Sequence, residues 1–134
     1  MADRAGPGAA APALQAAYPQ LFVADFGVSC AFFERKLGFA VVFQYGEPPF
    51  YGQVQRGAAR LNLRHVDASP FDGDVREREV LLSAYIPVEN MRALYVEYQA
   101  SGAEFQQPLT KQPWGVEEFV VRDPDGNLLC FGSS

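Results

Sequence analysis

The sequence has 134 residues, of which 49% are hydrophobic and 20% charged, and its formal net charge is -5. This composition is typical of a folded globular domain and argues against a disordered chain. The acidic balance also argues against nucleic acid as the main partner, because phosphate binding needs clustered Lys and Arg, and it mildly favours a cationic ligand.

The first 17 residues are small and rich in alanine, so we expect a disordered tail over residues 1–17. This segment lacks the apolar core of a signal peptide, and no stretch approaches the roughly 18 apolar residues of a membrane span. Two cysteines are too few for a disulfide framework. These features predict a cytoplasmic protein that does not cross a membrane.

The first predicted unit begins with a short apolar strand that ends at Val23. Asp25 is a candidate N-cap for a following amphipathic helix, and Gly38 is placed where a C-cap glycine is expected. Three strands follow, over about residues 40–44, 51–56 and 60–66. In the last of these, leucines alternate with polar residues, so one face is predicted to be buried and the other polar.

A second unit repeats this order at a spacing of about 65 residues. A strand ends at Val88, Asn90 is the candidate N-cap, and the helix stops at Gly102. Strands are predicted over about 104–109, 117–122 and 127–132. The sequence therefore predicts an α+β fold of two βαβββ modules that form a curved mixed sheet trough with helices on the outer face. The modules span about 18–66 and 80–132 of a single domain at 18–134, and residues 67–79 are predicted to be a polar linker loop.

The segment Arg122–Asn127, RDPDGN, is interpreted as a structural hairpin turn, because Pro, Asp and Gly supply turn geometry. Trp114 lies in a second turn, PWG. We place it at the mouth of the trough, with the aromatic residues Phe43, Tyr45, Phe50 and Tyr51 nearby. The alternative is that Trp114 is a hydrophobic plug at the turn, since Trp is usually well buried.

Alternation along the strands predicts which side chains face the trough: Tyr18, Gln20, Phe22, Arg60, Asn62, Arg64, Ser83, Tyr85 and Cys130. Glu117 and Glu118 are adjacent, so only one faces it, and Glu118 is favoured. The sequence contains no Ser-His-Asp set, no carboxylate pair flanking a gap and no phosphate-binding glycine loop. Aromatic rings with scattered hydrogen-bonding groups predict a pocket for a flat or amphipathic organic molecule.

The paired modules, the LGF after the first helix and the stretch PWGVEEFVVRDPDGNLLCFG together resemble the vicinal oxygen chelate superfamily. That group contains glyoxalase I, extradiol dioxygenases, and the fosfomycin- and bleomycin-resistance proteins. PWG, EEF, RDPDGN and LYVEY are most similar to the bleomycin-resistance type. The resemblance extends over about Tyr18 to Gly132 and is specific for the fold, whereas the fold supports many activities.

The resemblance implies four metal-ligand positions, which fall here on Tyr18, Asn62, Ser83 and Cys130. Ser and Asn are weak neutral donors and a lone Cys favours softer metals, so we expect no metal site and no cofactor. The single histidine, His65, is expected on the opposite face. Cys130 is interpreted as a small apolar filler; a reactive thiol would need a cationic neighbour such as Arg60 or Arg64.

The resemblance implies a homodimer that binds a drug-like aromatic or cationic molecule and confers antibiotic resistance by sequestration, with no catalytic residues. Two alternatives are a glyoxalase- or dioxygenase-like enzyme with a displaced metal site, and metal-free catalysis with Tyr18, Tyr85 or Glu118 as acid or base. Arg60 and Arg64 favour a ligand with acidic or phenolic oxygens over bleomycin itself. The predicted ligand-binding residues are Tyr18, Phe22, Arg60, Asn62, Arg64, Ser83, Tyr85, Trp114, Glu118 and Cys130.

Overall fold

The computed structural model describes residues 10–134, and these form two four-stranded mixed sheets with three helices. The first module contains β1 (Gln20–Val23), α1 (Phe26–Leu37), β2 (Ala40–Tyr45), β3 (Tyr51–Arg56) and β4 (Ala59–His65). The linker contains α2 (Gly73–Arg78). The second module contains β5 (Ala84–Val88), α3 (Met91–Ser101), β6 (Glu104–Lys111), β7 (Glu117–Arg122) and β8 (Leu128–Ser133).

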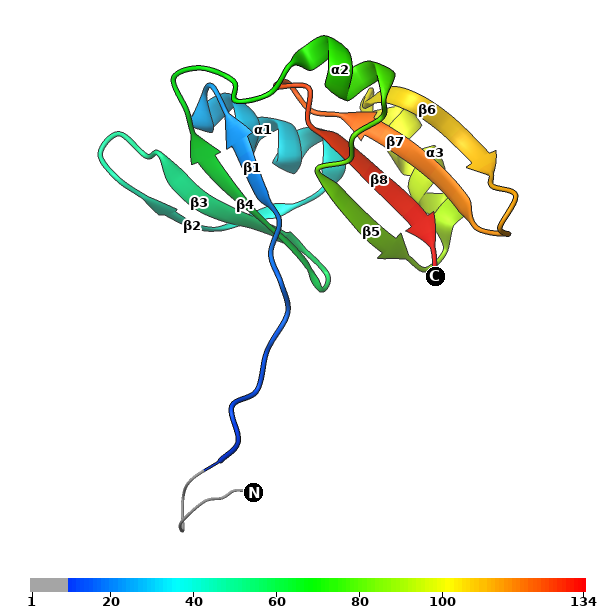
Figure 1. Cartoon of the computed structure of the whole chain (residues 1–134), viewed down its shortest axis with the longest axis horizontal. Helices are drawn as coiled ribbons and strands as arrows, with labels where there is room; N and C mark the ends of the chain where they lie inside the picture. The colour runs from blue at the N-terminus through cyan, green and yellow to red at the C-terminus, as the bar shows by residue number, and fades with distance from the viewer. Residues whose placement is uncertain (1–9) are drawn as a thin grey trace.

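Each module closes one sheet, with strand order β1-β4-β3-β2 in the first and β5-β8-β7-β6 in the second. The first and last strands of each module pair in parallel, and the other neighbours are antiparallel. The sheets lie side by side, with α1 and α3 behind them and α2 near the upper end of the junction (Figure 1). The predicted α+β arrangement of two βαβββ modules is thus confirmed, as two sheets and not one continuous sheet.

Helix α1 forms because its ends and its buried face are all encoded locally. The Asp25 side chain accepts a hydrogen bond from the Val28 N–H at 3.0 Å, as the predicted N-cap should. Phe26, Cys30, Phe33 and Leu37, which recur at helical spacing on the apolar face of the expected amphipathic helix, are all buried. At the other end Gly38 has a φ of 74°, a left-handed conformation that glycine adopts without strain.

Helix α3 starts differently from α1. Asn90 takes the N-cap position as predicted, but its φ is 60° and its side chain makes no capping hydrogen bond. Asn tolerates this left-handed conformation better than most residues. The helix ends at the predicted Gly102, whose φ is 81°.

The prediction that residues 67–79 form only a loop was wrong, because Gly73–Arg78 forms α2. Asp72 caps this helix by accepting hydrogen bonds from the N–H groups of Asp74 and Val75. Six residues are too few to show a helical hydrophobic period, so the sequence pattern gave no signal.

One hydrophobic core joins both modules on the helix side of the sheets. It contains alternate residues of the central strands, including Leu61 and Leu63 of β4 and Phe119 and Val121 of β7. The aromatic ring of Tyr98 in α3 is completely buried, and its hydroxyl donates to the Leu37 carbonyl of α1 at 2.8 Å. The helices therefore pack against each other as well as against their own sheets.

The part of the predicted tail that the structure describes, residues 10–17, is exposed and forms no helix or strand. Residues 1–9 of that prediction lie outside the described residues. The segment leading into β1 extends away from the two sheets (Figure 1). Among the described residues, no helix is long and apolar enough to span a membrane.

The turn Asp123–Asn127 connects the second module to the first. The Asp125 side chain accepts a hydrogen bond from the Ala24 N–H at 2.8 Å, and the Asn127 amide donates to the Phe22 carbonyl at 3.2 Å. Asn127 is 1% exposed and also bonds to Asp123. Burial raises the pKa of the Asp123 carboxyl to about 6, although the hydrogen bonds it accepts from Asn127 and Asp125 act to lower it.

We expect the substitution Asn127→Ala to lower the free energy of unfolding by about 2 to 4 kcal/mol, because buried partners in both modules lose their hydrogen bonds. Chemical denaturation measures this difference. Thr110→Ala is the control, since the Thr110 hydroxyl makes only an exposed bond to the Pro108 carbonyl. Equal stabilities of the two variants would contradict the role of Asn127.

Candidate functional site

The side of the two sheets opposite α1 and α3 carries the residues predicted to line the trough, and we call it the open face. Strand register defines it. In the first sheet Gln20 pairs with Asn62, and Phe22 pairs with Arg64. In the second sheet Tyr85 pairs with Cys130, and Glu118 pairs with Gly132.

Polar groups on the first sheet form a connected chain. The Gln53 amide donates to Asn62 Oδ1 at 2.9 Å and accepts from the Arg60 guanidinium at 3.2 Å. The Arg60 guanidinium also lies 6.0 Å from the centre of the Tyr18 ring. Sequence reasoning omitted Gln53, which could have been found from its position opposite Asn62 in the β3–β4 hairpin.

Aromatic side chains cover the outer part of the same sheet. The rings of Phe43 and Tyr51 are 5.9 Å apart, and those of Tyr45 and Phe50 are 5.7 Å apart. Phe43, Tyr45 and Phe50 are all exposed. A shift in register after Val41 places Phe43 opposite Gln53, on the open face. These rings form a surface on which a flat molecule can stack.

On the second sheet Tyr85, Glu118 and Cys130 lie together. Partial burial, followed by the neighbouring Glu118 carboxylate, raises the pKa of Tyr85. The Tyr85 hydroxyl occupies the space that a side chain at position 132 would need, so Gly132 permits this close approach. Tyr85 therefore keeps its phenolic proton at neutral pH, and its hydroxyl can donate a hydrogen bond.

The two adjacent glutamates face opposite sides, as alternation predicts. Glu118 shares a face with Tyr85, whereas the Glu117 carboxylate pairs with Arg92 of α3 at 2.8 Å. Only Glu118 therefore belongs to the open face.

Trp114 lies in the turn between β6 and β7 and is 70% exposed. The alternative interpretation of Trp114 as a buried plug was therefore wrong. Its side chain projects from the end of a hairpin, where no core surrounds it.

Two of the carried-over metal positions differ from their predicted places. Tyr18 and Ser83 both precede their strands, which begin at Gln20 and Ala84. Proline at 19 lacks an N–H for the ladder, although its carbonyl still accepts from the Asn62 N–H at 2.9 Å. By register, Gln20 is the partner of Asn62 and Tyr85 the partner of Cys130.

The donor set does not suit the divalent metal that the superfamily's enzymes hold. Asn62 Oδ1 is already bonded to Gln53, and the Ser83 hydroxyl lies 3.3 Å from Asn127. Within residues 10–134, no group of three or more His, Cys, Asp and Glu side chains is placed to hold a metal ion. His65 instead contacts the Ala24 carbonyl at 2.9 Å and Asp67 at 3.0 Å.

Cys130 packs with Val120 and Leu128 and is 2% exposed. Burial, and secondarily the Glu118 carboxylate, raise its pKa to about 12. The thiol therefore stays protonated at neutral pH, which fits an apolar filler and not a nucleophile. Neither Arg60 nor Arg64 contributes to this pKa, so the condition for a reactive thiol is not met.

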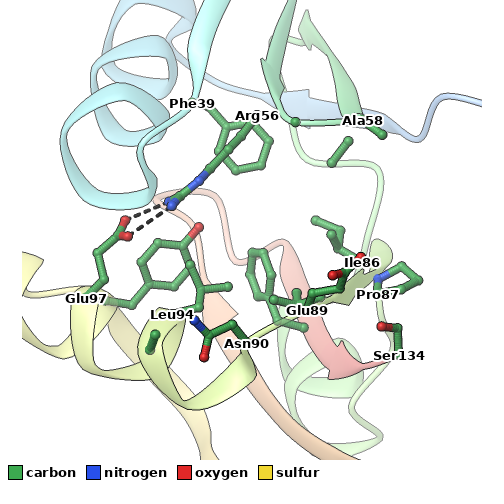
Figure 2. A pocket seen from close by; sticks show the side chains of 16 residues that line it. Phe39, Arg56, Ala58, Ile86, Pro87, Glu89, Asn90, Leu94, Glu97 and Ser134 are labelled. Atoms are coloured by element: carbon green, nitrogen blue, oxygen red, sulfur yellow. Dashed lines mark hydrogen bonds and ion pairs between the residues drawn. The ribbon is translucent and has the colours of Figure 1, made fainter.

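The larger of two described pockets, here called the α3 cleft, has a volume of about 700 Å³. It lies between the β3–β4 turn, the end of β5 and α3, and it contains none of the ten predicted ligand-binding residues. Figure 2 shows Arg56 and Glu97 joined at one side of it, and their Nη1 and Oε2 atoms are 2.6 Å apart. Hydrogen bonding to Arg56 lowers the pKa of Glu97, and burial raises that of Tyr98 to about 12. The Arg56–Glu97 pair therefore links β3 of the first module to α3 of the second.

A second pocket of about 370 Å³, here called the junction pocket, lies between α2 and the module junction. Of the predicted ligand-binding residues it contains Ser83 alone, and it also includes Gln20 of the open face. Arg76 of α2 lines it and is 7% exposed. Sequence reasoning missed Arg76, because a charged residue in a polar linker looks solvated.

We expect native Cys130 to react with iodoacetamide at least about 100-fold more slowly than in the unfolded protein, because its pKa is near 12. The Cys30→Ser variant isolates Cys130, and intact mass at timed intervals measures the reaction. The Cys130→Ser variant provides the matched control for Cys30, whose thiol is also buried. Rapid alkylation of native Cys130 would contradict its interpretation as a filler.

Comparison with known proteins places these features in a family. A model of the Glyoxalase/Bleomycin resistance protein/Dioxygenase superfamily matches residues 15–131. A search of curated proteins finds no match.

Solved structures agree with this assignment. The bleomycin-binding protein of bleomycin-producing Streptomyces verticillus, complexed with copper(II)-bleomycin, is 26% identical, with a TM-score of 0.72 over 92% of this chain and 99% of that one. UcmS2 is 27% identical, with a TM-score of 0.68 over 90% of this chain and 100% of that one. A bleomycin-binding protein complexed with bleomycin is 24% identical, with a TM-score of 0.74 over 90% and 99% of the two chains, and it supports the fold alone. The chain therefore belongs to the glyoxalase/bleomycin resistance protein/dioxygenase superfamily.

Proposed function

We propose that the protein is a cytoplasmic homodimer that binds a small aromatic molecule on its open face and sequesters it without breaking a bond. The observation that carries this proposal is the surface of exposed aromatic rings next to the Arg60–Gln53–Asn62 chain. Rings on such a surface stack on a flat ligand, and the polar chain fixes its orientation. The proposed contacts are nine of the ten residues predicted from the sequence, because the tenth, Cys130, is buried as a filler.

The charges of this face favour a ligand with acidic or phenolic oxygens. Arg60 and Arg64 both lie on the strand β4, and Arg64 is exposed. Their guanidinium groups pair best with oxygen anions. Glu118 supplies the opposite charge on the second sheet, where a cationic or hydroxyl group of the same ligand would lie. The bleomycin-binding relatives support a drug-like ligand, while these arginines favour one other than bleomycin.

The environment of two open-face groups argues against their use as general bases. The raised pKa values of Tyr85 and Cys130 keep both protonated at neutral pH, so neither serves as a base. Proton transfer is most efficient when the pKa of the catalytic group lies near the working pH. Asn62 and Gln53 bond to each other and have no titratable proton.

A second copy of the chain supplies the missing half of the proposed site. The α3 cleft lies off the open face, and the junction pocket reaches it only at its edge, through Gln20 and Ser83. One chain therefore offers the ligand a surface, whereas an enclosed site needs a cover. The exposed rings of Tyr45, Tyr85 and Trp114 would be covered by such a partner.

We expect a flat phenolic or acidic antibiotic to bind with a micromolar or lower dissociation constant, equivalent to about −8 kcal/mol or stronger. Titrations of metal-free bleomycin and a panel of such compounds, followed by Trp114 fluorescence and by calorimetry, measure it. Arg60→Gln should weaken binding of the best acidic ligand about tenfold, because one charge-assisted hydrogen bond is lost.

The matched control for this titration is Arg92→Gln, since Arg92 pairs with Glu117 away from the open face. Equal losses in the two variants would contradict binding at Arg60. If calorimetry detects no heat of binding for any compound of the panel, the proposed ligand class is contradicted. Chemical change of a bound compound would contradict sequestration.

We expect sedimentation equilibrium to give twice the chain mass of 14.7 kDa at micromolar concentration. Because the second copy closes the site, ligand affinity should fall on dilution together with the dimer fraction. A monomer that binds ligand with undiminished affinity would contradict the shared site.

A further inference from the structure

We propose that the junction pocket binds the carboxylate of a small organic acid with an apolar body, and that Arg76 is the cation that holds it. The superfamily assignment does not explain why α2 of the linker carries a buried arginine. The proposal does not rest on the sequestration function, because its cation lies on the linker helix and most of the pocket lining lies off the open face.

The first step is that the Arg76 charge is buried without a counter-charge. Arg76 is 7% exposed, and within residues 10–134 no carboxylate lies within ion-pairing distance of it. Its partners are neutral oxygens: Nη1 donates to Asn127 Oδ1 at 3.0 Å, and Nη2 donates to the Asp125 carbonyl at 2.8 Å. Buried charges in proteins are normally paired, so this guanidinium lacks an anion.

The second step is that the guanidinium still has hydrogen atoms to donate. Arg76 Nε is buried and has no hydrogen-bond partner among the described residues. Of the five N–H groups of a guanidinium, the two described bonds use two. An unsatisfied buried donor in a folded protein calls for an explanation, and a bound anion is one that also supplies the missing counter-charge. A carboxylate can accept from Nε–H and one remaining terminal N–H in the bidentate geometry that arginine favours.

The third step is that the pocket walls specify an apolar body for this acid. Phe71, Val75, Leu81 and Leu82 line the junction pocket beside Arg76, and Phe71, Leu81 and Leu82 are each exposed. The centre of the Phe71 ring lies 4.8 Å from the guanidinium carbon, a cation–π contact that places an apolar face beside the cation. Gln20 and Ser83 add neutral polar groups.

The turn after α2 brings these walls to the cation. Val80 has a φ of 51°, an uncommon conformation for a β-branched residue, and the following Leu81 N–H bonds to the Arg76 carbonyl at 2.9 Å. This backbone bond holds the leucine side of the pocket against Arg76.

The acidic groups nearby make their described hydrogen bonds and ion pairs with partners other than Arg76. Asp72 lines the pocket, but its Oδ1 accepts the N–H groups of Asp74 and Val75. The Asp125 carboxylate accepts from the Ala24 N–H, and Glu77 of the same helix pairs with Arg122 at 2.7 Å. None of these carboxylates forms an ion pair with Arg76, so a carboxylate from outside the described residues would be its first counter-charge.

The test follows the Arg76 Nε–H resonance of the full-length wild-type protein by NMR during titration with sodium benzoate, benzamide and inorganic phosphate. We expect a saturable shift with benzoate and none with benzamide or phosphate, since only benzoate joins a carboxylate to an apolar ring. Arg76→Gln should weaken benzoate binding at least about tenfold. Arg78→Gln, on the exposed side of α2, should leave it unchanged.

Several results would overturn the proposal. Equal shifts with benzamide would show an apolar pocket without anion selectivity, and equal shifts with phosphate would show a general anion site. A resonance that moves with protein concentration and ignores benzoate would show that a second copy neutralises Arg76. The wild-type titration decides these outcomes even where Arg76→Gln does not fold. The drug titrations with the Arg60 variant test the open face independently, so the sequestration proposal and the Arg76 proposal can each fail without the other.

Discussion

The buried amide of Asn127 is the constraint on which the arrangement of the two modules depends. It donates to the Phe22 carbonyl of the first module and to the Asp123 carboxylate of its own turn, and its oxygen accepts from Arg76 of the linker. One side chain thus fixes the first strand, the last hairpin and the linker helix relative to one another. A side chain without both a donor and an acceptor cannot do this, which explains an asparagine at a position that is 1% exposed.

The two modules differ in the length of the turn between their last two strands, and the longer turn makes a contact between the modules. In the first module, β3 and β4 are joined by the short turn Gly57–Ala58, between the paired residues Arg56 and Ala59. In the second, the equivalent pair Arg122 and Leu128 is separated by the longer turn 123–127. The additional residues supply all the side-chain bonds to the first module at this end. At the opposite end, Arg56 reaches across to Glu97 instead. The RDPDGN segment is therefore a hairpin turn, as its composition predicted, and also the contact between modules, which its composition could not reveal.

Local patterns predicted the fold and the facing of individual strands, because alternation and capping act over a few residues. The buried leucines of β4, the Asp25 cap and the orientation of Glu118 are examples. Features that depend on long-range pairing were not predictable in this way. Gln53 joins the polar chain only through hairpin register, and Arg76 is buried only because a turn about 50 residues further along the chain supplies its acceptors. A six-residue helix likewise gives no periodic signal. The sequence also placed the ligand positions Tyr18 and Ser83 on strands that they precede, because spacing alone does not fix a strand's first paired residue.

The distribution of charge changes what the net charge of -5 implies. A whole-chain balance suggests attraction of cations, yet arginines lie at both of the proposed ligand sites. Arg60 is held on the open face by Gln53 and stands against Tyr18, and Arg76 is held in the junction pocket by neutral oxygens. Acidic residues near them are used for caps, turns and ion pairs with other arginines. Coulombic attraction at contact distance in a partly buried site exceeds the screened field of distant surface charges. The two proposed sites therefore favour acidic oxygens in a ligand, although the protein as a whole is acidic.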